Sequence, residues 1–289
     1  MLAFQSPSQF ATAILSVFLL LLTTAVPVGN AQSCYTPVGH WKFDDGSGTS
    51  AVDSSGNANT GTLNNGPTWS NDVPSVSFTN TNSLSFDGSD DYVLVSNSPS
   101  VDIDDDTLTF TAWIKGAGTQ IIARSVDTSS PSGRVYGFYT ASWLGDVLGL
   151  EVRTVDGYAD LTSSVGISTN TWTHVAGVYD GTSLKLYING TLDANTAAIT
   201  GNIYDQQVDV HIGVFQPGVS PFSGLIDDLR LYEEALTSTE VGNVMTYGSS
   251  CGAAPVPEFS EWVMLLFTIA AGIIAFSYRD RLGLLVRPY

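Results

Sequence analysis

Short segments in which apolar and polar residues alternate recur along the middle of the chain, separated by turns rich in Gly and Asp. In one of them, residues 108–114, the apolar residues Leu108, Phe110, Ala112 and Ile114 occupy every second position. Successive side chains of a β-strand point to opposite faces, so this spacing places all four on one face. The two-residue period does not fit the 3.6-residue period of an amphipathic helix. The pattern therefore predicts β-strands.

The sequence after residue 171 has the pattern of consecutive hairpins. The strand-like segment 172–179 is followed by the turn pair Asp180-Gly181 and then by residues 184–188, in which alternate residues are apolar. The pair Asn189-Gly190 comes next, and Asn-Gly readily adopts the positive φ angles of a tight two-residue turn. This region predicts antiparallel strands joined by short turns.

Residues 208–214 alternate in the same way, whereas a helical pattern is confined to residues 233–245. Without the two apolar ends considered below, residues 32–254 remain, a length that suits one all-β domain. The predicted fold is therefore all-β, with two packed antiparallel sheets and one late helix.

Charge excludes several classes of protein. The chain has 28 acidic and 10 basic residues, a net charge of −18, and only 13% charged residues, against about a quarter in typical soluble proteins. This composition excludes a basic nucleic-acid-binding protein, a coiled coil and a multi-span membrane protein. Residues 32–254 contain 25 of the acidic residues, of which four are glutamate. Aspartate is common in turns and as a calcium ligand, so both explanations remain open.

The amino-terminal end contains an apolar run at residues 11–26, followed by the small residues Gly29 and Ala31. This order predicts a secretory signal peptide over residues 1–31, cleaved before Gln32. Because no Lys or Arg precedes the run, an uncleaved membrane span is the alternative.

The carboxy-terminal end contains 17 uncharged residues at 262–278, which as a helix would span about 25 Å, at the short limit for crossing a bilayer. Arg279, Arg281 and Arg287 follow. The positive-inside rule places the basic tail, residues 279–289, in the cytoplasm. The sequence therefore predicts an exported domain at the cell surface, anchored by a transmembrane helix.

A short motif, Pro257, Glu258 and Phe259, lies in the linker 252–261 before this span. The motif, the span and the arginines together resemble the sorting signals of exosortase and archaeosortase substrates, which have a Pro-Glu-Pro-like motif. Phe259 stands where the commoner motif has its second proline. The resemblance implies a processing enzyme in the membrane that cuts near Glu258 and transfers or releases the domain. An ordinary single-span anchor is the alternative.

The two cysteines, Cys34 and Cys251, bracket the predicted domain, residues 32–251. In an exported chain this placement predicts one disulfide between the first and last parts of the domain. Closing a loop of 217 residues would stabilise the fold by at most about 5 kcal/mol. Lipid modification of Cys34 is the weaker alternative.

Seven short segments of the body, most of them with aromatic or apolar residues beside Asp, Asn or Gly, follow one another in a characteristic order. They are residues 39–44, 53–57, 84–88, 91–93, 172–176, 186–190 and 224–232. In this order they resemble the laminin-G-like, concanavalin A-like jelly-roll domain. The resemblance implies a jelly-roll β-sandwich of the kind found in lectin-like binding modules and in domains appended to bacterial surface enzymes. Such a fold does not by itself determine function.

The resemblance also implies a structural Ca²⁺ ion. Alternation over residues 225–231 would place Asp227 on the same face as the leucines of that strand, and a buried charge there must be paired or bind a metal. The resembled family often carries calcium near this position, with ligands from an early turn. The expected ligands are Asp53, Asn57 and Asp227, with backbone carbonyls and water. Alternatively, Asp227 accepts backbone N–H groups or pairs with an arginine.

Residues 131–160, the least regularly patterned part of the body, contain the aromatic residues Tyr136, Tyr139, Trp143 and Tyr158. Gly and Ser surround them, which predicts a loop-rich rim. Aromatic rings beside planar polar groups are suited to binding sugars, so these four are the expected ligand-binding residues. The alternative is that the rings fill the core.

Two known catalytic motifs are missing from the sequence: the Glu-x-Asp-x-x-Glu run of jelly-roll glucanases and the His-Glu-x-x-His helix of metal-dependent proteases. We therefore expect no catalysis, and a binding or adhesion module for carbohydrate or extracellular matrix. The alternatives are a polysaccharide-cleaving enzyme whose carboxylates the sequence does not reveal, and a structural coat protein.

Overall fold

The computed structural model describes residues 34–125, 133–204 and 206–251. The chain divides into two units, residues 1–251 and 252–289, and the described residues all belong to the first. The predicted signal peptide, sorting motif, membrane helix and basic tail lie outside the described residues. Within the described part of the chain, no helix is long and apolar enough to cross a membrane.

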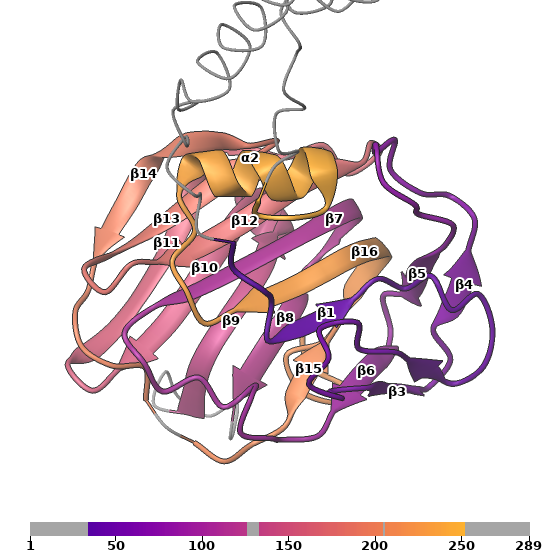
Figure 1. Cartoon of the computed structure of the whole chain (residues 1–289), viewed down its shortest axis with the longest axis horizontal. Coiled ribbons are helices and arrows are strands. Elements are labelled where there is room, and N and C mark those ends of the chain that lie inside the picture. The colour runs from indigo at the N-terminus through magenta and orange to yellow at the C-terminus, as the bar shows by residue number, and fades with distance from the viewer. Residues whose placement is uncertain (1–33, 126–132, 205, 252–289) are drawn as a thin grey trace, which may run out of the picture. The chain divides into compact units, whose positions relative to one another are not determined.

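Two antiparallel sheets pack face to face, which confirms the predicted all-β sandwich (Figure 1). In sheet I the strand order is β14-β13-β12-β7-β16-β5-β4, and β1 also pairs with β16. Its strands are β1 (Gly39–Trp41), β4 (Thr68–Ser70), β5 (Ser83–Asp87), β7 (Leu108–Gly118), β12 (Thr173–Tyr179), β13 (Ser183–Ile188), β14 (Thr191–Ala198) and β16 (Phe222–Tyr232).

In sheet II the order is β11-β10-β9-β8-β15-β6-β3-β2. Its strands are β2 (Ser50–Ala51), β3 (Gly61–Asn64), β6 (Tyr92–Val95), β8 (Gln120–Ser125), β9 (Arg134–Ala141), β10 (Val147–Thr154), β11 (Gly157–Gly166) and β15 (Val210–Ile212). The described helices are the 3-10 helix η2 (Ser142–Leu144) and the α-helix α2 (Ser238–Tyr247).

The main core lies between the sheets. In β7 the side chains of Leu108, Phe110, Ala112 and Ile114 are at most 1% exposed, which confirms the predicted inward face. Phe138 of β9 stacks on Phe110, with ring centroids 5.8 Å apart, so the two sheets meet through these rings.

The predicted hairpins are confirmed. β12 pairs with β13, and β13 pairs with β14 through a turn at Asn189 and Gly190. These two residues have φ angles of 49° and 75°, the positive values for which Asn-Gly is suited.

A smaller apolar cluster lies on the outer face of sheet I, the face turned away from sheet II. There Val178 and Tyr232 pack with Val241 and Val244 of α2, and Figure 1 shows α2 lying across this sheet. The helix is shorter than the predicted 233–245, because Thr237 caps it. The Thr237 side chain accepts a hydrogen bond from the Glu240 amide while the Glu240 carboxylate accepts one from the Thr237 amide.

The predicted orientation of the Asp227 side chain, on the same face of the strand as Leu229 and Leu231, is wrong. Ile226 and Leu229 both lie in the core, because the register of β16 against β7 shifts between Asp227 and Arg230. Asp228 takes a φ of 47° at this bulge. Asp227 lies opposite Trp113 in the register, and therefore points to the outer face of sheet I. An inserted bulge residue reverses the alternation beyond it.

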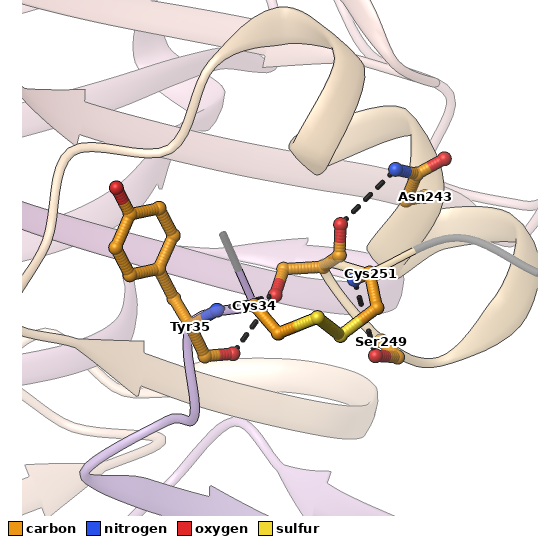
Figure 2. Close-up of a disulfide and its surroundings, with 6 residues drawn as sticks. Cys34, Tyr35, Asn243, Ser249 and Cys251 are labelled. Carbon is orange, nitrogen blue, oxygen red and sulfur yellow. Dashed lines mark hydrogen bonds between the residues drawn. A yellow bond between two sulfur atoms is a disulfide. The ribbon is translucent and has the colours of Figure 1, made fainter. Parts of the chain in front are cut away.

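The predicted disulfide between Cys34 and Cys251 is confirmed, with a Cα–Cα distance of 4.9 Å. Hydrogen bonds around it tie the two ends of the domain together (Figure 2). The Ser250 hydroxyl accepts from the Tyr35 amide (2.9 Å) and donates to the Tyr35 carbonyl (2.8 Å). Asn243 of α2 donates to the Ser250 carbonyl. Disulfides of this kind persist in oxidising compartments, so the bond indicates an exported domain.

Candidate ligand-binding surface

Residues 133–160 form regular strands rather than the predicted loop-rich rim. β9 and β10 pair without a break from Val147–Ala141 to Val152–Tyr136. Glycines inside these strands leave room for large side chains of neighbouring strands to pack directly against the backbone. A Cβ atom on Gly149 would lie 2.2 Å from the Tyr139 ring. The prediction of a loop-rich rim was wrong, because these glycines allow side chains to approach the strand backbone closely and do not mark turns.

Tyr136 is not a ligand-binding residue. Its side chain is fully buried, and its ring lies 5.2 Å from that of Phe110 in the core. For this tyrosine the structure favours the alternative that the ring fills the core.

The other three predicted aromatic residues do not face the core. Tyr139 of β9 and Tyr158 of β11 lie on the outer face of sheet II, 8% and 37% exposed, and Trp143, in η2 between β9 and β10, is 65% exposed. Trp143 lies at the end of β10 where Val147 pairs with Ala141, whereas Tyr158 pairs with Arg153 at the opposite end of β10.

Two carboxylates hold the tyrosines in place. The Tyr158 hydroxyl donates to Glu151 Oε2 at 2.8 Å, and the Tyr139 hydroxyl donates to Asp160. Glu151 and Asp160 lie directly opposite each other in the register of β10 and β11. Arg134 also donates to Glu151 Oε2. We name this group of five residues the tyrosine platform.

Glu151 is the buried centre of the platform, with a side chain only 1% exposed. Burial raises its pKa above the ordinary value, and the nearby Arg134 only partly offsets this effect. Its second oxygen, Oε1, has no hydrogen-bond partner among the described residues. Burial also raises the pKa of Tyr139, and hydrogen bonding to Asp160 adds to this shift. Both tyrosine hydroxyls therefore stay protonated as donors.

The platform continues toward a cleft. The guanidinium of Arg134 lies 4.8 Å from the centre of the Phe215 ring, a cation–π contact. Arg134 pairs in register with Ser125, which lines a cleft of about 420 Å³. Asp209 and Gln216 contribute to the same lining, so the cleft offers polar groups beside the aromatic platform.

Two of the predicted metal ligands, Asp53 and Asn57, belong to one hydrogen-bond network of the early turn, linked through Ser55. Asp53 accepts from the amides of His40, Ser55 and Asn59 and from the Ser55 hydroxyl, at 2.7–2.9 Å. Asn57 donates its side-chain amide to the Val38 carbonyl. These bonds hold the early turn in place.

Asp227 is different, because its Oδ2 accepts from Asn80 at 2.8 Å while Oδ1 has no partner in the described part of the chain. Burial raises the pKa of Asp227 to about 8. Of the three predicted ligands, Asp227 alone has the unsatisfied buried oxygen that a cation would explain.

Sequence reasoning missed a second acidic group, Asp87, Asp90 and Asp91, whose carboxylate oxygens lie within 4.8 Å of one another. Burial raises the pKa of Asp91. The signal was present in the Asp-Gly-Ser-Asp-Asp turn between β5 and β6. Asp87 and Asp91 belong to two of the segments that resemble the family, and Asp90 lies between these segments.

A family model described as the concanavalin A-like lectin/glucanases superfamily matches residues 87–242. The chain belongs to this superfamily. The match runs from the end of β5 into α2 and includes the whole tyrosine platform. No match was found among curated proteins.

Solved structures share the superfamily fold at low sequence identity. Domain 4 of AbnA, a GH43 extracellular arabinanase from Geobacillus stearothermophilus, was solved with arabinotriose; it has a TM-score of 0.56 and 20% identity, and the match covers 74% of this chain and all of that one. The binding domain of Paraclostridial Mosquitocidal Protein 1 has a TM-score of 0.57 and 15% identity, with 73% and 52% covered. The botulinum neurotoxin serotype G binding domain has a TM-score of 0.53 and 16% identity, with 72% and 50% covered. The chain thus spans about half of each toxin binding domain.

Proposed function

We propose that this domain is an exported, non-catalytic binding module for carbohydrate or extracellular matrix, and that the tyrosine platform with Trp143 is its binding surface. The observation that supports this most is the set of aromatic rings fixed beside planar polar groups on an outer sheet face. Sugar rings have apolar faces that pack on aromatic rings and hydroxyl groups that bond to polar neighbours.

The platform offers both kinds of contact. Tyr158 and Trp143 are exposed enough to be contacted from solvent. Arg134 and Asp160 supply a donor and an acceptor beside Tyr158, and the adjoining cleft adds further polar groups. A chain of several sugar units would lie across the strands and reach the cleft.

The comparisons support a binding role. The AbnA domain was solved with an arabinose trisaccharide, and the toxin domains are named as binding domains. We transfer the general role and not the particular ligand, since at these identities the likeness shows the fold.

Polysaccharide cleavage is the second candidate, because Glu151 and Asp160 lie opposite each other and burial raises the pKa of Glu151. Glycosidases use two carboxylates that both reach the sugar. Glu151 is buried beneath Arg134 and Tyr158 and orients them. This arrangement favours binding over catalysis.

The test is a glycan array probed with the full chain and with Tyr158→Ala and Trp143→Ala variants. The matched control is Leu192→Ala, since Leu192 is an exposed apolar residue of β14 in the other sheet. We expect both platform variants to lose signal on the same glycans while the control keeps it. Equal signal from all variants would refute the platform, and reducing ends released by wild type but not by Glu151→Gln would support an enzyme.

Calcium remains a proposal, now centred on Asp227 because of its unsatisfied buried oxygen. Ca²⁺ would supply there the positive charge that the buried carboxylate lacks. Asp53 would join only by giving up hydrogen bonds that hold the early turn. Binding measured by isothermal titration, and lost in Asp227→Asn, tests the proposal.

Surface attachment is likewise proposed. We propose that the domain is anchored by the span 262–278 or transferred after cleavage near Glu258 by an exosortase-type enzyme. Mass spectrometry of the mature protein tests both parts, because a carboxy terminus near Glu258 supports sorting and an intact Tyr289 supports a retained anchor.

A further inference from the structure

A second cavity, of about 330 Å³, opens on the outer face of sheet I. Residues of β1 and β16 form its floor, residues 78–80 form one wall, and Gly248, just after α2, lies at its side. The volume is at the small end of the range for small-molecule sites, about 300–1,000 Å³. It suits one ring-sized ligand.

The floor is a buried polar network. Asp228 Oδ1 lies 2.7 Å from His40 Nε2 and accepts from Arg230 Nη2 at 2.8 Å. His40, Asp228 and Arg230 are 8%, 5% and 2% exposed. Arg230 Nη1 has no hydrogen-bond partner among the described residues. The Tyr232 hydroxyl also interacts with this guanidinium. Because no hydrogen bond of normal geometry satisfies Nη1, the floor contributes a buried donor that is left open.

The wall contributes a matching acceptor. Asp44 Oδ1 accepts from the amides of Thr81 and Asn82, at 2.6 and 3.1 Å, and so fixes the turn that follows Asn80. The Asn80 side-chain nitrogen donates to Asp227, which fixes the amide plane. Asn80 Oδ1 has no partner in the described part of the chain.

The cavity carries no net charge. Lys42 and Arg230 balance Asp44 and Asp228. An anion would satisfy Arg230 but leave Asn80 Oδ1 unpaired and face two carboxylates. A cation would satisfy Asn80 Oδ1 but would leave Arg230 Nη1 unpaired and would face two positively charged side chains. A hydroxyl group satisfies both, since it donates and accepts at once.

We propose that this cavity binds a neutral polyhydroxylated ring, such as the terminal unit of a glycan, with hydroxyl groups accepting from Arg230 and donating to Asn80. Phe78, whose ring lies 5.9 Å from the Arg230 guanidinium, supplies an aromatic wall for the apolar face of the ring. The site lies on a different sheet from the tyrosine platform and does not rest on the function proposed for that platform.

The experiment is ligand-observed saturation-transfer NMR on the full chain in detergent. The probes are methyl glycosides of neutral hexoses, and sodium sulfate and CaCl₂ serve as competitors. Tyr158→Ala and Trp143→Ala are introduced into every sample, so the platform does not contribute to the signal. The test variants are Asn80→Ala, which removes the acceptor, and Thr79→Trp, which fills the cavity from an exposed lining position. Thr196→Trp, at an exposed position of β14, is the matched control.

We expect at least one glycoside to bind in the control. Its affinity should fall tenfold or more in Asn80→Ala, and binding should be lost in Thr79→Trp. Neither salt should displace the glycoside. The proposal is overturned if no neutral glycoside binds, if both variants bind as well as the control, or if sulfate or Ca²⁺ displaces the probe. Because Thr79 is exposed, its variant tests the site even if Asn80→Ala disturbs the wall.

Discussion

Asp228 and Glu151 are both buried carboxylates on outer sheet faces, but their surroundings have opposite effects. Burial raises the pKa of each, yet Arg230 and His40 reverse this effect for Asp228, whose pKa is lowered. For Glu151 the partners Arg134 and Tyr158 do not outweigh burial, and the pKa is raised. Asp228 lies between two buried partners, whereas Arg134 is 36% exposed.

The contrast indicates two roles for the two carboxylates. Asp228 belongs to a paired network that holds β1 against β16. Glu151 keeps an unpaired oxygen beneath partly exposed aromatic and charged groups. On sheet I the unpaired atoms are not those of Asp228 but Arg230 Nη1 and Asn80 Oδ1, beside the cavity proposed as a ligand site.

The largest expected effect comes from breaking the paired carboxylate. Asp228→Asn keeps the size and tolerates the positive φ, but leaves Arg230 buried without its counter-charge. We expect a loss of about 3–5 kcal/mol in the free energy of unfolding, measured by urea denaturation. A loss below about 1 kcal/mol would show that the network on sheet I is not structural.

The next effect concerns Asp227 and depends on pH. Its folded pKa of about 8 exceeds the ordinary 3.8, so the native state favours the protonated form. The associated stability is complete below pH 4 and is lost as pH rises toward 8, at about 1.4 kcal/mol per pH unit. With a chelator present, wild type should lose several kcal/mol relative to Asp227→Asn between pH 5 and 8.

The same comparison of wild type with Asp227→Asn, repeated in excess Ca²⁺, tests whether the ion binds at Asp227. Bound calcium would keep Asp227 ionised and remove most of the pH-dependent loss. If the stability difference between wild type and Asp227→Asn does not change with pH in the chelator, the raised pKa is contradicted. If the pH-dependent loss of stability is the same in Ca²⁺ as in the chelator, the metal proposal is contradicted.

A smaller effect is expected at Glu151. Glu151→Gln keeps the shape and removes the charge, and its partner Arg134 reaches solvent. We expect a loss of about 1 kcal/mol in the free energy of unfolding, well below that of Asp228→Asn, together with weaker glycan binding because Tyr158 and Arg134 lose their fixed positions. A stability loss equal to that of Asp228→Asn would remove the contrast between the faces.

The smallest effect on stability is expected at Trp143. Because 65% of its side chain is exposed, Trp143→Ala should change the free energy of unfolding by no more than about 0.5 kcal/mol. Glycan affinity should still fall by about five- to tenfold, equivalent to roughly 1 kcal/mol. Calorimetric titration measures the affinity and thermal melting measures the stability of the same variant. If binding is lost only because Trp143→Ala unfolds, the proposed contact of Trp143 with ligand is contradicted.

The fold could be predicted from sequence because it follows local rules. The alternation through Phe110 and the Asn189-Gly190 turn each specify their own structure. The sheet face to which Asp227 points could not be predicted, because the bulge at Asp228 depends on pairing with a strand distant in sequence. Tyr136 and Tyr139 look alike in sequence, and only the register of β9 separates core from surface. The cavity beside Asn80 also required the fold, since it joins β1, β16 and residues 78–80.

The central claim, that the outer face of sheet II binds ligand, is tested most directly by hydrogen–deuterium exchange of the full chain with and without a glycan that binds on the array. We predict slower exchange in β9, β10 and β11 and in residues 213–219 when the glycan is present. Protection confined to β12–β14 or to α2, with β9–β11 unchanged, would contradict the claim.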